Sequence, residues 1–367
     1  MGKMRKNIVL ISLMLLLLAS VLFSGCQNDA ASSKEYDYGQ QEILITGLEE
    51  KEFTITVEEL TRLDSVTEKA EANRFNGESV KIKAHGPTLN TFLKQYGKKQ
   101  SDFAAIRFTA SDQYAIAVPN EILQKRDIIL TYADGGNPLI KEDQPLRAVI
   151  PGERAMYWVR MLKQIDFETE AGAAVSSHVV FLDNAVKSLP FIAYKDGTDR
   201  GNGVKTKALI EKYANREDVS NVYLTGGDGL KKNEIADTFL SAYVKYTGTD
   251  TPKYLAPHFP EGMEITNLLS FSYGDTTFYS LEEGMNVLKK REINGYVGIG
   301  FSDIIKEIPF QSGLYYIVTD GNQNQIKLTE EQLGQGVFYT QEGVWSFCYG
   351  DGGQEQILNI LQIDTAL

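Results

Sequence analysis

The sequence predicts an α+β fold of tandem mixed modules of strands and short helices, with two or three repeated units. Short segments of alternating polar and apolar residues, typical of strands, are interleaved with segments of helical apolar spacing. Helices precede strands without the regular crossovers of parallel sheets, which favours α+β over a doubly wound sheet. The third observation is that the same order of segments recurs along the chain.

The recurrence is clearest between residues 86–138 and 203–252. Each stretch has a glycine, an amphipathic helix ending near a tyrosine, an alternating strand (IRFTA or VYLTG) and a turn headed by Asp112 or Asp228. Residues 298–343 keep the order more loosely, with SDIIKEI as a helix, YYIVTDG as a strand and LTEEQL as a second helix. Three ordered matches indicate duplication. The alternative is generic α+β patterning.

Composition indicates a folded chain. The 367 residues are 43% hydrophobic and 23% charged, enough apolar material for two or three cores. The formal net charge of -12 argues against nucleic acid or anionic lipid as the main partner, unless a local basic patch intervenes.

The N-terminus has the pattern of an export signal. Three basic residues fall among the first six, an apolar run covers 8–23, and a small-residue site ends at Cys26. This resembles a bacterial lipoprotein signal, in which Cys26 is acylated and becomes the mature N-terminus; an uncleaved anchor is the alternative. We therefore expect an extracytoplasmic protein attached to membrane lipid through Cys26. With Cys26 lipidated, Cys348 is the one remaining thiol, so no intramolecular disulfide is expected.

These patterns predict five consecutive regions. They are a signal peptide at 1–26, a flexible tether at 27–41, and three units at 42–170, 175–273 and 274–367.

The first unit, over residues 42–168, resembles the molybdopterin-binding domain of the sulfite oxidase family. The resemblance is carried by ILITGLEEKEFTITVEELTRL, GPTLNTFLKQYG, IRFTASDQYAIAVPNEIL and, most specifically, by PLRAVIPGERAMYWVRML at 145–162. In that last stretch the residues that match the family pattern are Arg147, Pro151, Gly152 and Arg160. Tyr157 stands where the family often has an arginine.

The resemblance implies a cleft that holds the pterin dithiolene and its phosphate. Arg147, Arg154, Tyr157 and Arg160 are the implied cofactor-binding residues, because arginines there would grip an anion. The alternative is that the arginines are surface residues paired with Glu142 or Asp143.

In the family the metal is held by one cysteine thiolate, and the corresponding position falls near Asn73 or Arg74. No cysteine occurs there, or anywhere between Cys26 and Cys348. Molybdenum needs such a soft ligand. The three histidines, His85, His178 and His258, are scattered and form no ligand cluster.

We therefore expect no catalytic residue, no metal ligand and no cofactor. The domain would be a non-catalytic module that binds an unknown anionic small molecule or an envelope protein. The alternative is an active molybdopterin-dependent oxidoreductase of sulfite oxidase type. A calcium loop headed by Asp320 is a further alternative, disfavoured because Gln325 stands where that loop needs glycine. A hairpin turn is the favoured interpretation.

Overall fold

Strands and short helices alternate along the chain, which confirms the expected α+β class. The structure is a computed structural model. It describes residues 36–73, 79–169, 175–196, 199–214, 219–256, 258–260 and 262–366. Within these ranges no helix is long and apolar enough to cross a membrane. The predicted signal and most of the predicted tether lie outside the described residues.

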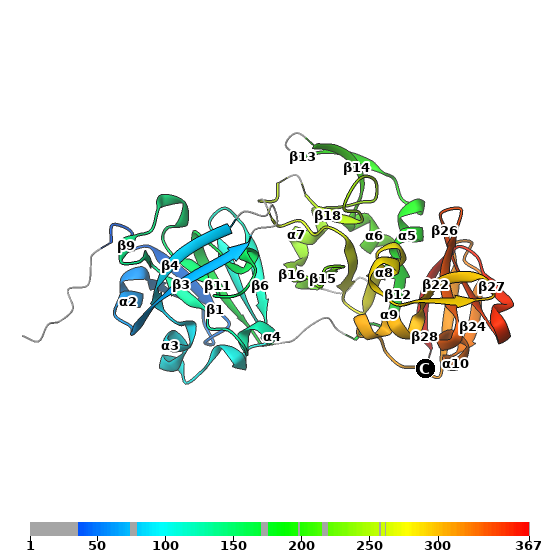
Figure 1. Cartoon of the computed structure of the whole chain (residues 1–367), viewed down its shortest axis with the longest axis horizontal. Helices are drawn as coiled ribbons and strands as arrows, with labels where there is room; N and C mark the ends of the chain where they lie inside the picture. Colours follow the sequence, from blue (N-terminus) through cyan, green and yellow to red (C-terminus); the bar gives the residue numbers. More distant parts are fainter. Residues whose placement is uncertain are drawn as a thin grey trace, which may run out of the picture. The chain divides into compact units, whose positions relative to one another are not determined.

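Residues 42–168, called the first domain below, have a five-stranded sheet at their centre (Figure 1). Its order is β2-β1-β11-β5-β6. The side chains of β1 alternate between buried and more exposed positions, as its sequence predicts, with Ile43 and Ile45 fully buried. β1 pairs with β11 in parallel, Leu44 opposite Gln164, while the other pairs are antiparallel. The bounds are β1 Glu42–Thr46, β2 Phe53–Thr56, β5 Ala105–Ala110, β6 Ala115–Pro119 and β11 Leu162–Glu168.

A second sheet of this domain contains a long hairpin, β3–β4, drawn in blue and cyan in Figure 1. Gly86, in β4, lies so close to the neighbouring chain that an added Cβ would be 2.0 Å from the Leu130 carbonyl oxygen. No larger residue fits there. The sheet order is β3-β4-β8-β9, with β3 Ser65–Asn73, β4 Ser79–Pro87, β8 Ala133–Asp134 and β9 Asn137–Pro138.

Short helices and a two-stranded pair complete the domain. Thr56 caps α2, accepting from the Glu59 amide while the Glu59 carboxylate accepts from the Thr56 amide, a reciprocal capping box. The helices are α2 Val57–Thr61, α3 Leu89–Leu93 and α4 Asn120–Leu123, with 3-10 turns η1 Lys94–Tyr96, η2 Gln100–Asp102, η3 Lys141–Asp143 and η4 Ala155–Tyr157. The pair is β7 Ile129–Thr131 with β10 Arg147–Val149.

Residues 175–273 and 274–366 share one eight-stranded sheet. Its order is β16-β15-β19-β20-β12-β28-β23-β24. β20, from the later stretch, lies between β19 and β12 of the earlier one, and β12 pairs on its other side with β28 near the C-terminus. The bounds are β12 His178–Phe181, β15 Asn221–Gly226, β16 Lys231–Ile235, β19 Leu268–Tyr273, β20 Thr276–Tyr279, β23 Tyr315–Asp320, β24 Gln325–Thr329 and β28 Ile360–Ala366.

Both faces of this sheet are buried. Val180 and Phe271 point into one core, which also contains Phe239, whereas Val179 and Tyr279 point into a second core. Burial on both sides explains why the central strands are apolar at successive positions instead of alternating. The surrounding helices are α5 Leu182–Ala185, α6 Thr206–Tyr213, α7 Ala236–Leu240, α8 Leu281–Val287, α9 Phe301–Glu307 and α10 Glu330–Gln335, with 3-10 turns η5 Val186–Ser188 and η6 Asp351–Gly353.

Two smaller sheets contain the remaining strands. One has the order β13-β14-β17-β18, and the other β21-β22-β25-β26-β27. Their bounds are β13 Ile192–Asp196, β14 Asp199–Lys205, β17 Tyr243–Lys245, β18 Lys253–Leu255, β21 Lys290–Ile293, β22 Tyr296–Gly300, β25 Val337–Gln341, β26 Val344–Tyr349 and β27 Glu355–Ile357.

The hairpins β5–β6, β15–β16 and β23–β24 turn in the same way. In each, an aspartate side chain accepts a hydrogen bond from the amide two residues ahead. The donors to Asp112, Asp228 and Asp320 are at 3.0, 2.9 and 2.8 Å. The predicted turn role of these three aspartates is therefore confirmed.

A second feature recurs beside each hairpin. The residue just before the strand that follows has a left-handed backbone, with φ of 50° at Met161 and Asn267 and 53° at Asn359. The backbone carbonyl oxygen of each of these residues accepts a hydrogen bond from a backbone amide next to the aspartate of the turn. The donor is the residue before the aspartate in the first two hairpins and the residue after it in the third. These matches support duplication of a common module, which stays a prediction.

Candidate functional site

The stretch 145–162, the most specific part of the family resemblance, runs through β10, a tight turn and η4 into β11. Gly152 has φ of +80°, a left-handed conformation that favours glycine and turns the chain after Pro151. This turn presents Glu153 and Arg154 at the surface beside the end of β3.

A depression of about 330 Å³ lies at that place. Its walls come from the two chain segments, with Glu71, Ala72 and Asn73 on one side and Gly152, Glu153 and Arg154 on the other. Asn73 is one of the two positions at which the resemblance puts the metal-binding cysteine; the other, Arg74, lies outside the described residues. The structure thus brings the family's arginine-containing turn beside the expected ligand position.

Of the four predicted cofactor-binding residues, Arg154 alone is among those lining this depression. Its guanidinium donates to Asp228, at 2.8 Å to the carboxylate and 3.3 Å to the carbonyl oxygen. Arg160 is exposed on the chain that leads into β11. Tyr157 is buried, and burial raises the pKa of its phenol to about 12, so it stays neutral at ordinary pH.

Arg147 is buried instead of facing a cleft. Its guanidinium donates to the Asp143 carboxylate at 2.7 Å and lies over the Trp158 ring, 5.8 Å from the centroid. Its Nε has no hydrogen-bond partner among the described residues. The alternative of surface arginines paired with Glu142 or Asp143 is not what is found, since Asp143 pairs with the buried Arg147 and Arg154 pairs with Asp228. Arg147 balances a buried carboxylate and has little positive charge left for a ligand.

The charges around the depression suit a phosphate poorly. The Glu71 carboxylate accepts from the Ser79 hydroxyl at 2.6 Å and lies 3.2 Å from Lys81, and these contacts lower its pKa, the Ser79 bond most. Glu153 lies 3.5 Å from Arg126. Arg154 is paired with Asp228, so each of these charges has a partner and the depression offers a phosphate little net positive charge.

The available donor atoms also do not fit a molybdenum dithiolene held by a thiolate. Cys348 lies in β26, in a different sheet, with its thiol buried against the Val337 carbonyl oxygen at 3.6 Å. Burial raises its pKa, which favours the neutral thiol. The described residues contain no group of three or more His, Cys, Asp and Glu side chains placed to hold a metal.

The histidines are hydrogen-bonded residues in separate parts of the chain, as expected. His85 contacts Thr67 at 2.7 Å and His258 contacts Ser241 at 3.3 Å. His178 contacts Asp364 at 2.5 Å.

The hairpin interpretation of the proposed calcium loop is confirmed. The Asp320 carboxylate accepts from the backbone amides of Asn322 and Asn324 and from the Asn324 side chain, which closes the turn between β23 and β24.

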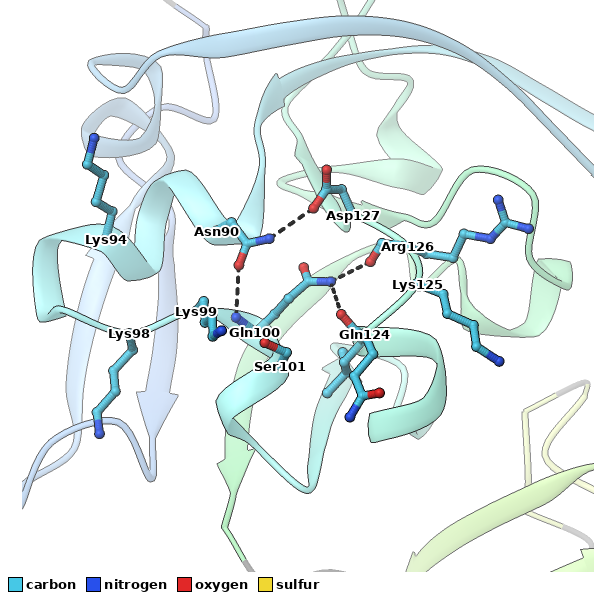
Figure 2. Close-up of a pocket in the computed structure, with 11 residues that line it drawn as sticks. Asn90, Lys94, Lys98, Lys99, Gln100, Ser101, Gln124, Lys125, Arg126 and Asp127 are labelled. Atoms are coloured by element: carbon cyan, nitrogen blue, oxygen red, sulfur yellow. Dashed lines mark hydrogen bonds between the residues drawn. The ribbon is translucent and has the colours of Figure 1, made fainter.

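Sequence reasoning missed a second, larger depression of about 540 Å³ on the first domain. Four lysines and an arginine line it (Figure 2). The signal was present as two short basic stretches, KQYGKKQ at 94–100 and QKRD at 124–127. Only the fold shows that they meet, through the hydrogen bond from Gln100 to Arg126.

Comparison with known proteins agrees with the resemblance. Residues 31–175 match the family described as "Oxidoreductase molybdopterin binding domain". No curated protein matches the chain. The solved structure of the sulfane dehydrogenase SoxCD from Paracoccus pantotrophus aligns with 89% of this chain and 79% of its own, at 13% identity. The TM-score of this alignment is 0.33.

Proposed function

For a chain whose residues 31–175 form an oxidoreductase molybdopterin-binding-type domain, we propose a non-catalytic binding role in a lipid-anchored, extracytoplasmic protein. The observation that carries the proposal is the lack of cysteine from residue 27 to residue 347. Molybdenum in this family depends on a protein thiolate, and carboxylate, amide and guanidinium groups are poor substitutes for soft sulfur.

The side chains around the former site support the same proposal. Arg147 is paired with Asp143 in the interior, and Arg154 is paired with Asp228 at the surface. A domain selected to hold a pterin phosphate would keep such arginines free for it. The fold of the domain is retained, while its arginines form ion pairs with carboxylates of the same chain.

Pterin analysis of the full-length chain, purified from its native envelope, tests the loss of the cofactor. Acid oxidation converts a bound molybdopterin into a fluorescent pterin that can be quantified per chain. We expect a yield far below one pterin per chain. A yield near one would contradict the proposal.

The second candidate is an active molybdopterin-dependent oxidoreductase. It is favoured by the family match and by the depression in which Asn73 meets Gly152 and Arg154. In that case the pterin would be held without a protein thiolate. A bound pterin that is lost on replacing Asn73 and Arg154 together with alanine would favour this candidate.

Lipid anchoring is tested at Cys26. We expect a diacylglycerol-modified N-terminal cysteine by mass spectrometry, and a Cys26→Ala chain that is neither acylated nor cleaved at this site. A wild-type chain that retains residues 1–25 would favour the uncleaved anchor instead.

A further inference from the structure

We infer that the basic depression on the first domain binds a ligand carrying two or more phosphate groups. The inference deepens the proposed binding role by assigning it a site and a ligand class. It does not depend on whether the domain also holds a pterin.

The depression is built from two basic segments. Lys94, Lys98 and Lys99 come from η1 and the loop before η2, and Lys125 and Arg126 come from the chain after α4. All five are exposed. Such clustering is unexpected on a chain with a net charge of -12, because the remaining surface is correspondingly more acidic.

A buried polar network fixes the distance between the two segments. Gln100 is 2% exposed, and its side-chain amide donates to the carbonyl oxygens of both Leu123, at 2.7 Å, and Arg126. The Asn90 side chain accepts from the backbone amide of Gln100 and donates to the Asp127 carboxylate, each at 2.9 Å. The cations are therefore carried by a preorganised frame, not by two independent loops.

Most of this positive charge has no counter-charge among the residues that the structure describes. Arg126 lies 3.5 Å from Glu153, but none of the four lysines forms an ion pair within the part of the chain that the structure describes. Asp127, the one carboxylate among the described residues that line the depression, is bonded to Asn90. Figure 2 shows the two basic segments on opposite sides of the Gln100 network, with Lys94, Lys98 and Lys125 extending away from it.

The residue types indicate the ligand class. Lysine acts as a point charge and binds phosphate well, whereas planar bidentate recognition of a carboxylate is the role of arginine. A single phosphate is too small to contact all of the cations around a depression of about 540 Å³. A ligand with at least two phosphate groups would engage both basic segments together.

The inference is tested by calorimetric titration of the full-length chain with inorganic tripolyphosphate, in a non-ionic detergent. We expect saturable binding that weakens as salt is raised. Orthophosphate should bind more weakly, because it reaches one segment at a time. Citrate should also bind more weakly, because its charges are carboxylates.

Charge reversal of one lysine from each segment, Lys98→Glu with Lys125→Glu, should weaken tripolyphosphate binding roughly tenfold or more. Lys98→Gln with Lys125→Gln should give an intermediate loss. The matched control is Lys69→Glu with Lys83→Glu, an exposed pair that faces across the β3–β4 hairpin and has the same change in charge. The control should stay within about twofold of wild type.

Absence of tripolyphosphate binding by the wild-type chain would overturn the inference. So would an equal loss in the control pair, which would indicate net charge instead of a site, or citrate binding as tight as that of tripolyphosphate. Unfolding temperatures equal to wild type would show that the variants are folded. The pterin measurement is independent of this titration, so the two proposals can fail separately.

Discussion

Arg147 shows at the scale of one residue how the domain departs from its family resemblance. By sequence it matches a cofactor-binding position, yet its guanidinium is buried between Asp143 and Trp158. The sequence contained both members of this pair, four residues apart, but burial decides between ligand binding and internal pairing. The burial of Arg147 depends on the pairing of β10 with β7. That pairing cannot be predicted from the sequence around Arg147.

Met161 is a strained residue, and asparagines, Asn267 and Asn359, stand at the corresponding places beside the other two hairpins. All three have φ near +50°, where a β-carbon costs about 1–2 kcal/mol and asparagine is better tolerated. We expect Met161→Asn to raise the free energy of unfolding by about 0.5–1 kcal/mol, measured by denaturant titration. The reciprocal variant, Asn267→Met, should lower it by a similar amount. Equal stability of all three chains would contradict the structural equivalence of the sites.

His178 gives the stability of the shared sheet a pH dependence. Its Nδ1 lies 2.5 Å from Asp364 and its Nε2 lies 3.7 Å from Asp275. The Asp364 hydrogen bond is the main cause that raises its pKa above the ordinary value of 6.5, against an opposing effect of burial. The stabilisation is therefore fully present below about pH 6.5 and is lost as pH rises through the higher folded pKa.

The corresponding experiment compares wild type with His178→Gln. We expect the difference in the free energy of unfolding to be larger at about pH 5.5 than at about pH 9. Asp364→Asn should remove most of the same pH dependence. A difference that grows toward high pH would contradict the assignment.

At the scale of the elements, the sequence predicted single elements better than their partners. The helices ending at Tyr96 and Tyr213 and the strands IRFTA, VYLTG and YYIVTDG are present, because their periodicity is local. The pairing of β12 with β28 joins His178 to Asp364, 186 residues apart, and no local pattern specifies it. Hence the shared sheet was not foreseen from three separate units.

The shared sheet predicts that residues 175–273 do not fold without the residues after them. A chain that ends at Gly274 lacks both strands that flank β12, namely β20 and β28. We expect fast amide hydrogen exchange at Val179 and Val180 in that chain.

Amides of β1 and β11 in the truncated chain provide the internal control, because their sheet is complete by Glu168. They should stay as protected as in the full-length chain. Retained protection at Val179 and Val180 would show that the second unit folds by itself.

At the scale of the whole molecule, composition gave the net charge but not its distribution. An acidic chain was expected to avoid anionic partners unless a local basic patch intervened, and the Lys94–Arg126 depression is such a patch. It escaped prediction because Gln100 joins two stretches that are separate in sequence. The family resemblance, in contrast, was visible from sequence because its main motif, 145–162, is contiguous.

The central claim is that this domain has kept its scaffold and lost its metal. The most direct test is the molybdenum content of the full-length chain purified from its native envelope, measured by inductively coupled plasma mass spectrometry. Because no thiolate is available between residues 27 and 347, we expect far less than one molybdenum atom per chain. One molybdenum atom per chain would contradict the claim and would favour an active oxidoreductase.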